Sequence, residues 1–263
     1  MADNQIKNKQ GLTEKEFLEQ YDVSIYRKPS VTVDMLIFTI MDEEKENYRK
    51  LPEKSLKILL IKRGEHPYIG KWALPGGFAC YDESLDEAAM RELKTETNIE
   101  DIYMEQLYTW GEVNRDPRTR VISSSYMALV DSTSLDIKAG DDADDAKWFN
   151  IKYNVLEENK VLQEKNFIYE KTVEIRLWNE SEELSTKIKI TESKDGKMSR
   201  EIIENEGIAF DHGKFIEYAL SRLRNKIEYT NLAFNLMPEL FTLTELQQVY
   251  EIIQGKELLA PAF

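Results

Sequence analysis

The sequence predicts an α+β fold with a helical segment at its C-terminal end, and three observations support this. Residues 31–38 and 56–61 are rich in β-branched and other apolar residues, as buried strands are. Ser84 and Glu87 form a capping box, which predicts the start of a helix. Apolar residues recur at helical spacing near the C-terminal end. We expect four parts, at residues 1–30, 31–153, 154–206 and 207–263.

The N-terminal part is expected to hold one short helix. Thr13 and Glu16 form a capping box, and Phe17, Leu18 and Tyr21 make the segment amphipathic. We interpret this helix as a lid or a dimer element, and we expect a homodimer. The charged stretch from 42 to 54 has almost no apolar periodicity and predicts a loop between the first two strands.

The helix after Ser84 carries two carboxylates, Glu92 and Glu96, four residues apart. Side chains at this spacing lie one above the other, so both carboxylates project from one face of the helix. Apolar residues to dock the helix are Leu85, Ala88, Ala89 and Leu93. Mg²⁺ and Mn²⁺ bind through one or two carboxylates and substrate phosphate oxygens. The sequence therefore predicts a divalent-cation site here, beside the glycine turn at 75–77.

Residues 77–99 resemble the Nudix box. The matching positions are Gly77, Glu83, Arg91, Glu92, Leu93, Glu96 and Ile99, after a similar lead-in at 72–76. The resemblance implies a Nudix α/β/α sandwich with a mixed sheet. It also implies a Mg²⁺- or Mn²⁺-dependent hydrolase that cleaves the diphosphate of a nucleoside diphosphate linked to another group.

Two positions depart from the box pattern. Asn98 stands where the pattern has Gly, and Asn is the next-best residue for a left-handed backbone just past a helix. Thr95 stands where the first Glu of a pair is expected. It removes one of three helix carboxylates, so we expect weaker metal occupancy.

The resemblance also implies roles for residues around the box. Glu92 and Glu96 are expected to bind the metal together with Gly76. Arg91 is expected to act indirectly, through a salt bridge to Glu87 or Glu83 that fixes the box loop. The residues expected to contact the substrate are Arg63, Gly76, Gly77, Phe78, Arg118 and Arg120. For Arg63, a solvated strand end is an equally open interpretation.

Two loops after the box helix are candidates for binding the substrate and for supplying the general base. The loop 112–119 and residues 120–123 resemble the Nudix branch that recognises ADP-ribose, and Arg118 and Arg120 would be phosphate or ribose contacts there. The alternative is a surface loop paired with its own carboxylates. In similar Nudix diphosphatases, a carboxylate at the position of the acidic run 140–145 acts as general base or extra ligand. Asp141 or Asp142 would have that role here, unless the run is only solvated.

Residues 154–206 predict a β-meander appended to the Nudix fold. We expect a polar helix at 156–167, alternating strands at 173–177 and 186–190, and a hairpin turn at 194–197.

The C-terminal part predicts two helices. Asp211 is expected to cap the first, and Thr242 to begin the second with Glu245 as its capping partner. Residues 209–212, 222–229 and 241–247 resemble the C-terminal segment of Nudix-related transcriptional regulators, which implies a partial winged helix. Residues 208–263 carry five cations and seven anions, which favours a dimerisation or capping domain. DNA is expected as a partner only if residues beyond Phe263 complete the winged helix.

The composition excludes several classes of protein. The 263 residues have a net charge of −14, which argues against a broad nucleic-acid surface but not a small local one. The sequence has no apolar run of membrane-spanning length and no signal peptide, so we expect a cytoplasmic protein without a membrane partner. One cysteine and two histidines leave almost no material for a zinc site. We expect Cys80 to pack in the box loop.

Two functions from different classes remain. The first is a hydrolase of ADP-ribose, in which a metal-activated water attacks one phosphorus. The second is a sensor that binds ADP-ribose or a relative without turnover and controls transcription. The Glu92 and Glu96 pair favours the hydrolase, whereas Thr95 and the regulator-like C-terminal part favour the sensor. The sequence alone ranks the hydrolase first.

Overall fold

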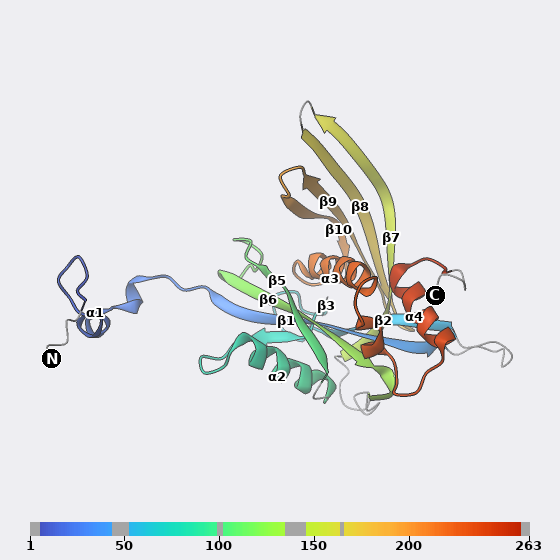
Figure 1. Cartoon of the computed structure of the whole chain (residues 1–263), viewed down its shortest axis with the longest axis horizontal. Helices are drawn as coiled ribbons and strands as arrows, with labels where there is room; N and C mark the ends of the chain where they lie inside the picture. Colours follow the sequence, from blue (N-terminus) through green and yellow to red (C-terminus); the bar gives the residue numbers. More distant parts are fainter. Residues whose placement is uncertain (1–5, 44–52, 99–101, 135–145, 164–165, 259–263) are drawn as a thin grey trace.

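The computed structural model describes residues 6–43, 53–98, 102–134, 146–163 and 166–258. Its centre is a sheet of ten strands in the order β10-β9-β8-β7-β2-β1-β6-β5, with β3 on β2 and β4 on β1 (Figure 1). The strands are β1 (Ser30–Glu43), β2 (Glu53–Lys62), β3 (Trp72–Ala73), β4 (Gly76–Phe78), β5 (Tyr103–Trp110), β6 (Val121–Asp131), β7 (Ala146–Gln163), β8 (Asn166–Trp178), β9 (Glu183–Ser193) and β10 (Met198–Glu206). Strands β1 and β6 pair in parallel and the other pairs are antiparallel, so the sheet is mixed, as expected.

The helices begin and end at the local signals that the sequence carries. They are α1 (Glu14–Gln20), α2 (Leu85–Thr97), α3 (His212–Ile227) and α4 (Leu243–Gln254), with 3₁₀ turns at Val23–Ile25, Ser132–Ser134 and Leu232–Leu236. Complete capping boxes precede α1, α2 and α4. Asn98 ends α2 in the left-handed conformation with a φ of 55°, as predicted.

The sheet has helices on both faces because β1 is buried on both sides. One set of alternating β1 side chains packs against α2, and these residues are Val33, Met35 and Ile37. The other set belongs to the larger core that includes α3 and α4, and these residues are Leu36, Phe38 and Ile40. Successive strand residues point to opposite faces, so one apolar run serves both layers. Figure 1 shows α2 on one side of the sheet and α3 and α4 on the other.

The polar helix expected at 156–167 is wrong, because residues 156–163 belong to β7 and residues 166–167 to β8, which pairs with it. A β-bulge between Val155 and Glu157 interrupts the two-residue alternation that would have indicated a strand. The hairpin also extends beyond the core and exposes apolar residues, including Leu162. The expected turn at 194–197 is confirmed: the Ser193 N–H donates to the Lys197 carbonyl at 2.9 Å.

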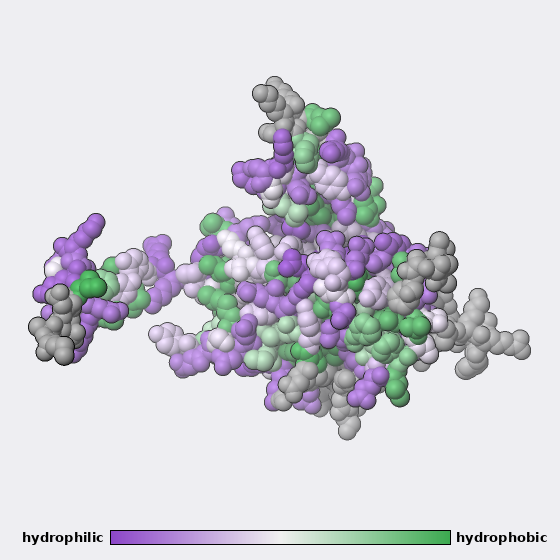
Figure 2. Space-filling view, viewed as in Figure 1, coloured by the Kyte–Doolittle hydropathy of each residue, from purple (hydrophilic) through white to green (hydrophobic). Residues whose placement is uncertain are grey.

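The first helix lies on an arm that stands clear of the rest of the chain (Figures 1 and 2). None of its residues is buried, and Phe17, Leu18 and Tyr21 are exposed. Its role as a lid or dimer element stays a prediction. Within the described ranges, no helix is long and apolar enough to cross a membrane.

The C-terminal helices share a hydrophobic core with the sheet. Phe215 of α3 is fully buried, and its ring stacks on Trp110 of β5 with centroids 4.2 Å apart and planes 13° apart. Aromatic pairs of this kind stabilise a fold beyond their area burial. The sheet and α3 therefore form one folding unit.

Phe215→Ala should lower the free energy of unfolding by about 3–5 kcal/mol, because it leaves a cavity between α3 and the sheet. Urea unfolding followed by tryptophan fluorescence and by circular dichroism measures the change. Phe17→Ala, in the exposed α1, is the control and should change stability by less than about 0.5 kcal/mol. A loss below about 1 kcal/mol for Phe215→Ala would show that α3 is not part of the main core.

Candidate functional site

The two box glycines lie where a side chain has no room. Strand β4 pairs with β1, opposing Gly76 to Asp34. A Cβ atom on Gly76 would lie 2.3 Å from the Val33 carbonyl oxygen, and one on Gly77 would lie 2.3 Å from Glu92 Oε1. Glycine is needed here because the backbone approaches other groups closely. Strand β4, which carries both glycines, therefore packs directly against the Glu92 carboxylate.

Arg91 links the box loop to the carboxylates of α2. Its Nη2 and Nε donate to Glu83 at 2.7 and 3.0 Å, and its Nη1 donates to Glu92 at 2.5 Å. Arg91 also donates to the Phe78 carbonyl at 3.2 Å. These bonds lower the pKa of Glu83 to about 2. The salt bridge expected to Glu87 or Glu83 is thus made to Glu83, while Glu87 caps the helix.

Glu92 and Glu96 lie close enough to repel each other. Glu92 is only 8% exposed and Glu96 is half-buried. Burial raises the pKa of Glu96, and the negative charge of Glu92 raises it further. A bound cation would relieve this repulsion, so the pair fits one Mg²⁺ that keeps several waters. Thr95 is exposed and its hydroxyl donates to the Arg91 carbonyl at 2.8 Å, so it adds no carboxylate.

We expect a metal site with two carboxylate ligands, Glu92 and Glu96, because the described residues offer no larger cluster of ligands. Within those ranges, no cluster of three or more His, Cys, Asp or Glu side chains is arranged to hold a metal. Asp141 and Asp142 lie outside the described residues, so the expected base or extra ligand has no position here. The assignment of Gly76 as a metal ligand stays a prediction.

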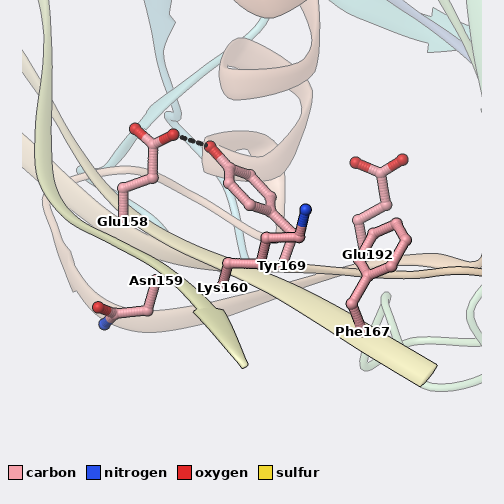
Figure 3. A pocket seen from close by; sticks show the side chains of 6 residues that line it. All are labelled: Glu158, Asn159, Lys160, Phe167, Tyr169 and Glu192. Carbon is pink, nitrogen blue, oxygen red and sulfur yellow. Dashed lines mark hydrogen bonds between the residues drawn. The ribbon is translucent and has the colours of Figure 1, made fainter. Parts of the chain in front are cut away.

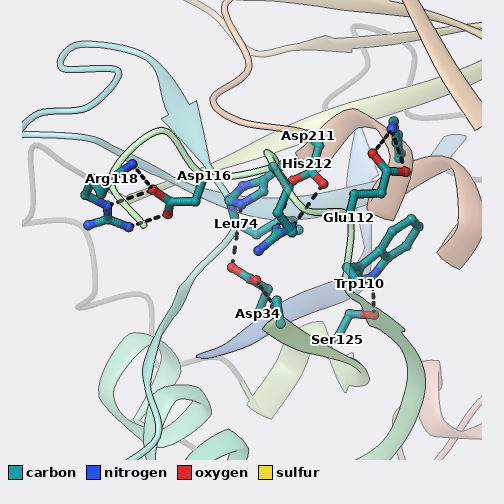
Figure 4. Close-up of polar contacts among 12 residues, drawn as sticks. Asp34, Leu74, Trp110, Glu112, Asp116, Arg118, Ser125, Asp211 and His212 are labelled. Carbon is teal, nitrogen blue, oxygen red and sulfur yellow. Dashed lines mark hydrogen bonds and ion pairs between the residues drawn. The ribbon is translucent and has the colours of Figure 1, made fainter. Parts of the chain in front are cut away.

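A pocket of about 160 Å³ opens beside Gly77. Segments far apart in the sequence line it, among them the box strand 76–78, the loop 115–118, and residues before and at the start of α3. Of the residues expected at the substrate, the pocket is lined by Arg63, Gly76, Gly77, Phe78 and Arg118. The pocket also receives Phe210 and His212 from the C-terminal part of the chain. Figure 4 shows His212 above Asp34, close to Asp211 and the Asp116–Arg118 pair.

The three arginines expected at the substrate differ in their partners. Arg118 makes a bidentate pair with Asp116 at 2.7 and 3.0 Å, so the interpretation of a loop paired with its own acid holds for this side chain. Arg120 lies outside the pocket lining and donates to the carbonyls of Gly111 and Glu112. Its expected role as a phosphate contact stays a prediction.

Of the three arginines that line the pocket, Arg63 has the charge that is least balanced by carboxylates. It donates to the carbonyl oxygens of Pro67 at 2.7 Å and Glu65 at 3.4 Å. No carboxylate of the described residues forms a salt bridge with it. Burial and then the charge of Arg118 lower its pKa, which an incoming anion would reverse. Arg63 is therefore the best-placed side chain to contact a phosphate.

A buried polar group joins β1 to the start of α3. The Leu74 N–H donates to His212 Nδ1 at 3.0 Å, and His212 Nε2 lies 3.6 Å from Asp34. The Ser123 hydroxyl also donates to Asp34. Burial lowers the pKa of His212 to about 4 and raises that of Asp34, so the imidazole is neutral at pH 7. Both groups are held by hydrogen bonds rather than by a strong ion pair.

Asp211 does not cap α3 with its side chain, contrary to the prediction. It makes a bidentate pair with Arg115 of the pocket loop at 2.8 and 3.1 Å. The bidentate geometry gives Asp211 two charge-assisted hydrogen bonds to a buried guanidinium, which accounts for the choice. Lys214 Nζ donates to Glu112 Oε2 at 2.9 Å, which is a second ion pair between α3 and the same loop.

Four residues of the pocket were not predicted from the sequence: Asp34, Arg115, Phe210 and His212. A lone carboxylate in the otherwise apolar β1 was the one available signal for Asp34. The other three come together only through the fold. Cys80, expected to pack, is exposed, and its N–H donates to Glu83 at 2.7 Å.

A second hollow lies on the extended hairpin and contains no residue expected at the site. It is lined by Glu158, Asn159, Lys160, Phe167, Tyr169 and Glu192 (Figure 3). The Tyr169 hydroxyl donates to Glu158 at 2.5 Å within it. Lys160 lies 4.7 Å from the centroid of the Phe167 ring in the same hollow.

Two known domain families match the sequence. The NUDIX domain matches residues 33–170, and the NrtR DNA-binding winged helix domain matches residues 233–263. The ADPR responsive transcriptional repressor NtrR of Acinetobacter baylyi is 33% identical over 253 residues, which are 95% of this chain and 77% of that protein. An ADP-ribose pyrophosphatase of Methanocaldococcus jannaschii is 37% identical over 140 residues, 52% of this chain and 73% of that protein.

Solved structures resemble the whole chain. A MutT/nudix family protein from Enterococcus faecalis has a TM-score of 0.65 at 30% identity, covering 94% of this chain and 83% of that one. Shewanella oneidensis NrtR has a TM-score of 0.59 at 29% identity, covering 89% of this chain and 82% of that one. The same protein complexed with a 27mer DNA has a TM-score of 0.58 at 28% identity, covering 88% and 78%.

Gly77→Ala should weaken divalent-cation binding about 10-fold or more, because the new methyl group displaces the Glu92 carboxylate. The free Mn²⁺ signal in electron paramagnetic resonance measures the affinity. Gly64→Ala is the matched control, since a Cβ there meets nothing within 4 Å. Equal Mn²⁺ affinity for Gly77→Ala and the unaltered protein would mean that Glu92 does not bind the ion.

Proposed function

The chain belongs to the Nudix family and carries an NrtR-type winged-helix segment at its C-terminal end, and from this we propose that it is a DNA-binding regulator whose Nudix pocket binds ADP-ribose. One observation carries the proposal. The pocket beside the box is lined both by box residues and by Phe210 and His212, which lead into α3. A ligand in this pocket therefore contacts the Nudix domain and the segment that joins it to the winged helix.

The site offers complementary groups to each end of a diphosphate. Glu92 and Glu96 would hold a Mg²⁺ that neutralises phosphate oxygens. Arg63 supplies a positive charge that no carboxylate of the described residues compensates by a salt bridge. Gly76 and Gly77 leave their backbone accessible at the pocket wall. These features support the binding of a nucleoside diphosphate in which the phosphates lie beside the box strand.

Two observations support regulation as the first candidate here, although the sequence alone ranks the hydrolase first. The Acinetobacter baylyi relative, named as an ADPR responsive repressor, matches over 95% of this chain. The box helix has lost one carboxylate at Thr95. We propose that DNA affinity changes when ADP-ribose enters the pocket, because Asp211 and Lys214 of the α3 segment are ion-paired to the pocket loop.

Hydrolysis of ADP-ribose is the second candidate, favoured by the intact Glu92 and Glu96 pair. A metal ion held there would supply an activated water and stabilise charge on the diphosphate. In that reaction Glu92 and Glu96 would hold the metal, Arg91 would keep Glu92 in place, and Arg63 would bind a phosphate oxygen. A homodimer and a cytoplasmic location remain part of this proposal.

Full-length protein should bind ADP-ribose in the presence of Mg²⁺ and release it intact. Calorimetric titration measures binding, and chromatography of the recovered ligand measures cleavage with Mg²⁺ and with Mn²⁺. Turnover at rates typical of enzymes, about 1–10³ s⁻¹, would instead identify a hydrolase. Absence of binding with either metal would overturn both functions.

Thr95→Glu should raise ADP-ribose hydrolysis most at low Mg²⁺ concentration, because a third carboxylate on the helix adds attraction for the cation. The exposed position of Thr95 leaves room for the longer side chain. Turnover measured against Mg²⁺ concentration, beside the unaltered protein, tests this. Thr95→Gln is the control, since it adds similar bulk without charge. Equal turnover of all three proteins at every Mg²⁺ concentration would show that the missing carboxylate does not limit catalysis.

A further inference from the structure

We infer that Phe210, the residue two positions before α3, is the surface on which the planar nucleobase of the ligand stacks. This inference rests on the proposed function and adds the place of the base. It means that the nucleobase end of the pocket is built in part by the C-terminal segment of the chain. Four observations on the segment and its neighbours support it.

The backbone around Phe210 is held in place on the sheet. The Ala209 N–H donates to the Trp72 carbonyl at 2.7 Å, and the Trp72 N–H donates to the Gly207 carbonyl at 2.9 Å. Ala209 and Asp211 are buried on either side. Phe210 is thus presented to the pocket by a rigid support, as a recognition surface requires.

Phe210 and Tyr68 both adopt a backbone conformation that aromatic residues rarely take. Phe210 has a φ of 51° and Tyr68 a φ of 65°, and their rings lie 4.7 Å apart between centroids. Asn98 is the one other non-glycine residue with positive φ in the described ranges, and it ends α2. Left-handed backbone at bulky residues is costly and gathers at functional sites. Here it brings two aromatic rings together beside the pocket.

Planar guanidinium groups face the same ring. Arg63 lies 4.9 Å from the centroid of Phe210, and Arg118 lies 5.8 Å from it. Arg118 also lies 5.6 Å from the ring of Phe78, which is half-exposed. Asp116 takes the hydrogen-bonding edge of Arg118, which leaves its planar faces to the rings. Rings and guanidinium planes are the surfaces on which nucleobases stack.

The groups that line the pocket differ in chemistry, which limits where each part of the ligand can lie. Gly77 lines the pocket, and a Cβ atom on it would lie 2.3 Å from Glu92 Oε1, so the metal and the diphosphate belong beside Gly77. Arg63 lies over the Phe210 ring, so the phosphate that it contacts is next to the base. Phe210 lies in the wall contributed by the C-terminal segment, among rings and guanidinium planes. A flat nucleobase matches these surfaces, whereas a sugar rich in hydroxyl groups needs hydrogen-bonding partners. Stacking area is largest for a purine, so we expect purine nucleotides to bind best.

Phe210→Leu should weaken binding of α,β-methylene ADP-ribose about 10-fold, because it keeps an apolar side chain but removes the stacking face. Binding of methylenediphosphonate, which has no base, should stay within about twofold. Phe210→Tyr keeps the ring and should bind both ligands like the unaltered protein. Phe234→Leu is the matched control, a half-exposed ring that packs on Phe241 in the same C-terminal part. Calorimetric titration with Mg²⁺ measures each affinity.

The outcomes separate this inference from the proposed function. If Phe210→Leu binds the nucleotide as tightly as the unaltered protein does, the stacking role is wrong and the proposed function stands. If Phe210→Leu loses affinity for both ligands equally, or Phe210→Tyr is as weak as Phe210→Leu, the residue acts only through the local structure. If the unaltered protein binds no α,β-methylene ADP-ribose, both the proposed function and the inference fail.

Discussion

The ion pair between Arg115 and Asp211 is the contact on which the pocket depends. It connects the loop after β5 to the residue before α3, and both side chains are almost fully buried, at 4% and 10% exposure. Removing one partner of such a pair leaves an uncompensated charge in the interior, which is strongly destabilising. Because the two segments are 96 residues apart in the sequence, this single pair closes a large loop of the fold. The pair lies between Phe210 and His212, which both line the pocket, and so helps to hold them there.

Some groups of the site are held by several contacts, whereas others carry a charge that no nearby opposite charge of the described residues balances. Arg91 donates to Glu92, and Gly77 packs closely against the same carboxylate, so Glu92 is held from two sides. Glu96 and Arg63 are each shifted away from their charged forms, the first by burial and Glu92, the second by burial and Arg118. A cation at one end and an anion at the other would satisfy both. A metal-bound diphosphate supplies these two charges in one ligand.

Local signals in the sequence predicted the parts of the structure that local interactions determine. The capping boxes of α1, α2 and α4, the left-handed Asn98 and the turn at 194–197 all depend on residues within a few positions of each other. The error at 156–167 arose because a bulge and exposure on both faces removed the strand pattern. The Asp211 side chain pairs with Arg115, 96 residues away, rather than with the N–H groups of its own helix. Residues 141 and 142 lie outside the described ranges and remain predictions.

Only part of the site could be predicted from the sequence, for the same reason. Glu92, Glu96, Arg91 and the glycines form a contiguous motif, so their types and spacing predicted their proximity. Asp34, Arg115, Phe210 and His212 meet through the pairing of β1 with β4 and the return of the chain along β3. No spacing rule covers separations of that length. Their chemistry could be recognised only once the strands were in place.

The shared core of α3 and the sheet limits where the winged-helix segment of such a protein could be replaced by another module. The junction suggested by the sequence, near residue 207, would cut between Phe215 and the Trp110 ring on which it stacks. A replacement module joined there would have to rebuild the buried surface of the sheet. The winged-helix family match begins at residue 233, after α3 has ended. Residues after α3 are buried in the same core, among them Leu236, Leu246 and Val249. A cut at either boundary would therefore expose buried apolar surface, so the winged-helix segment could be replaced only by a module that restores this packing.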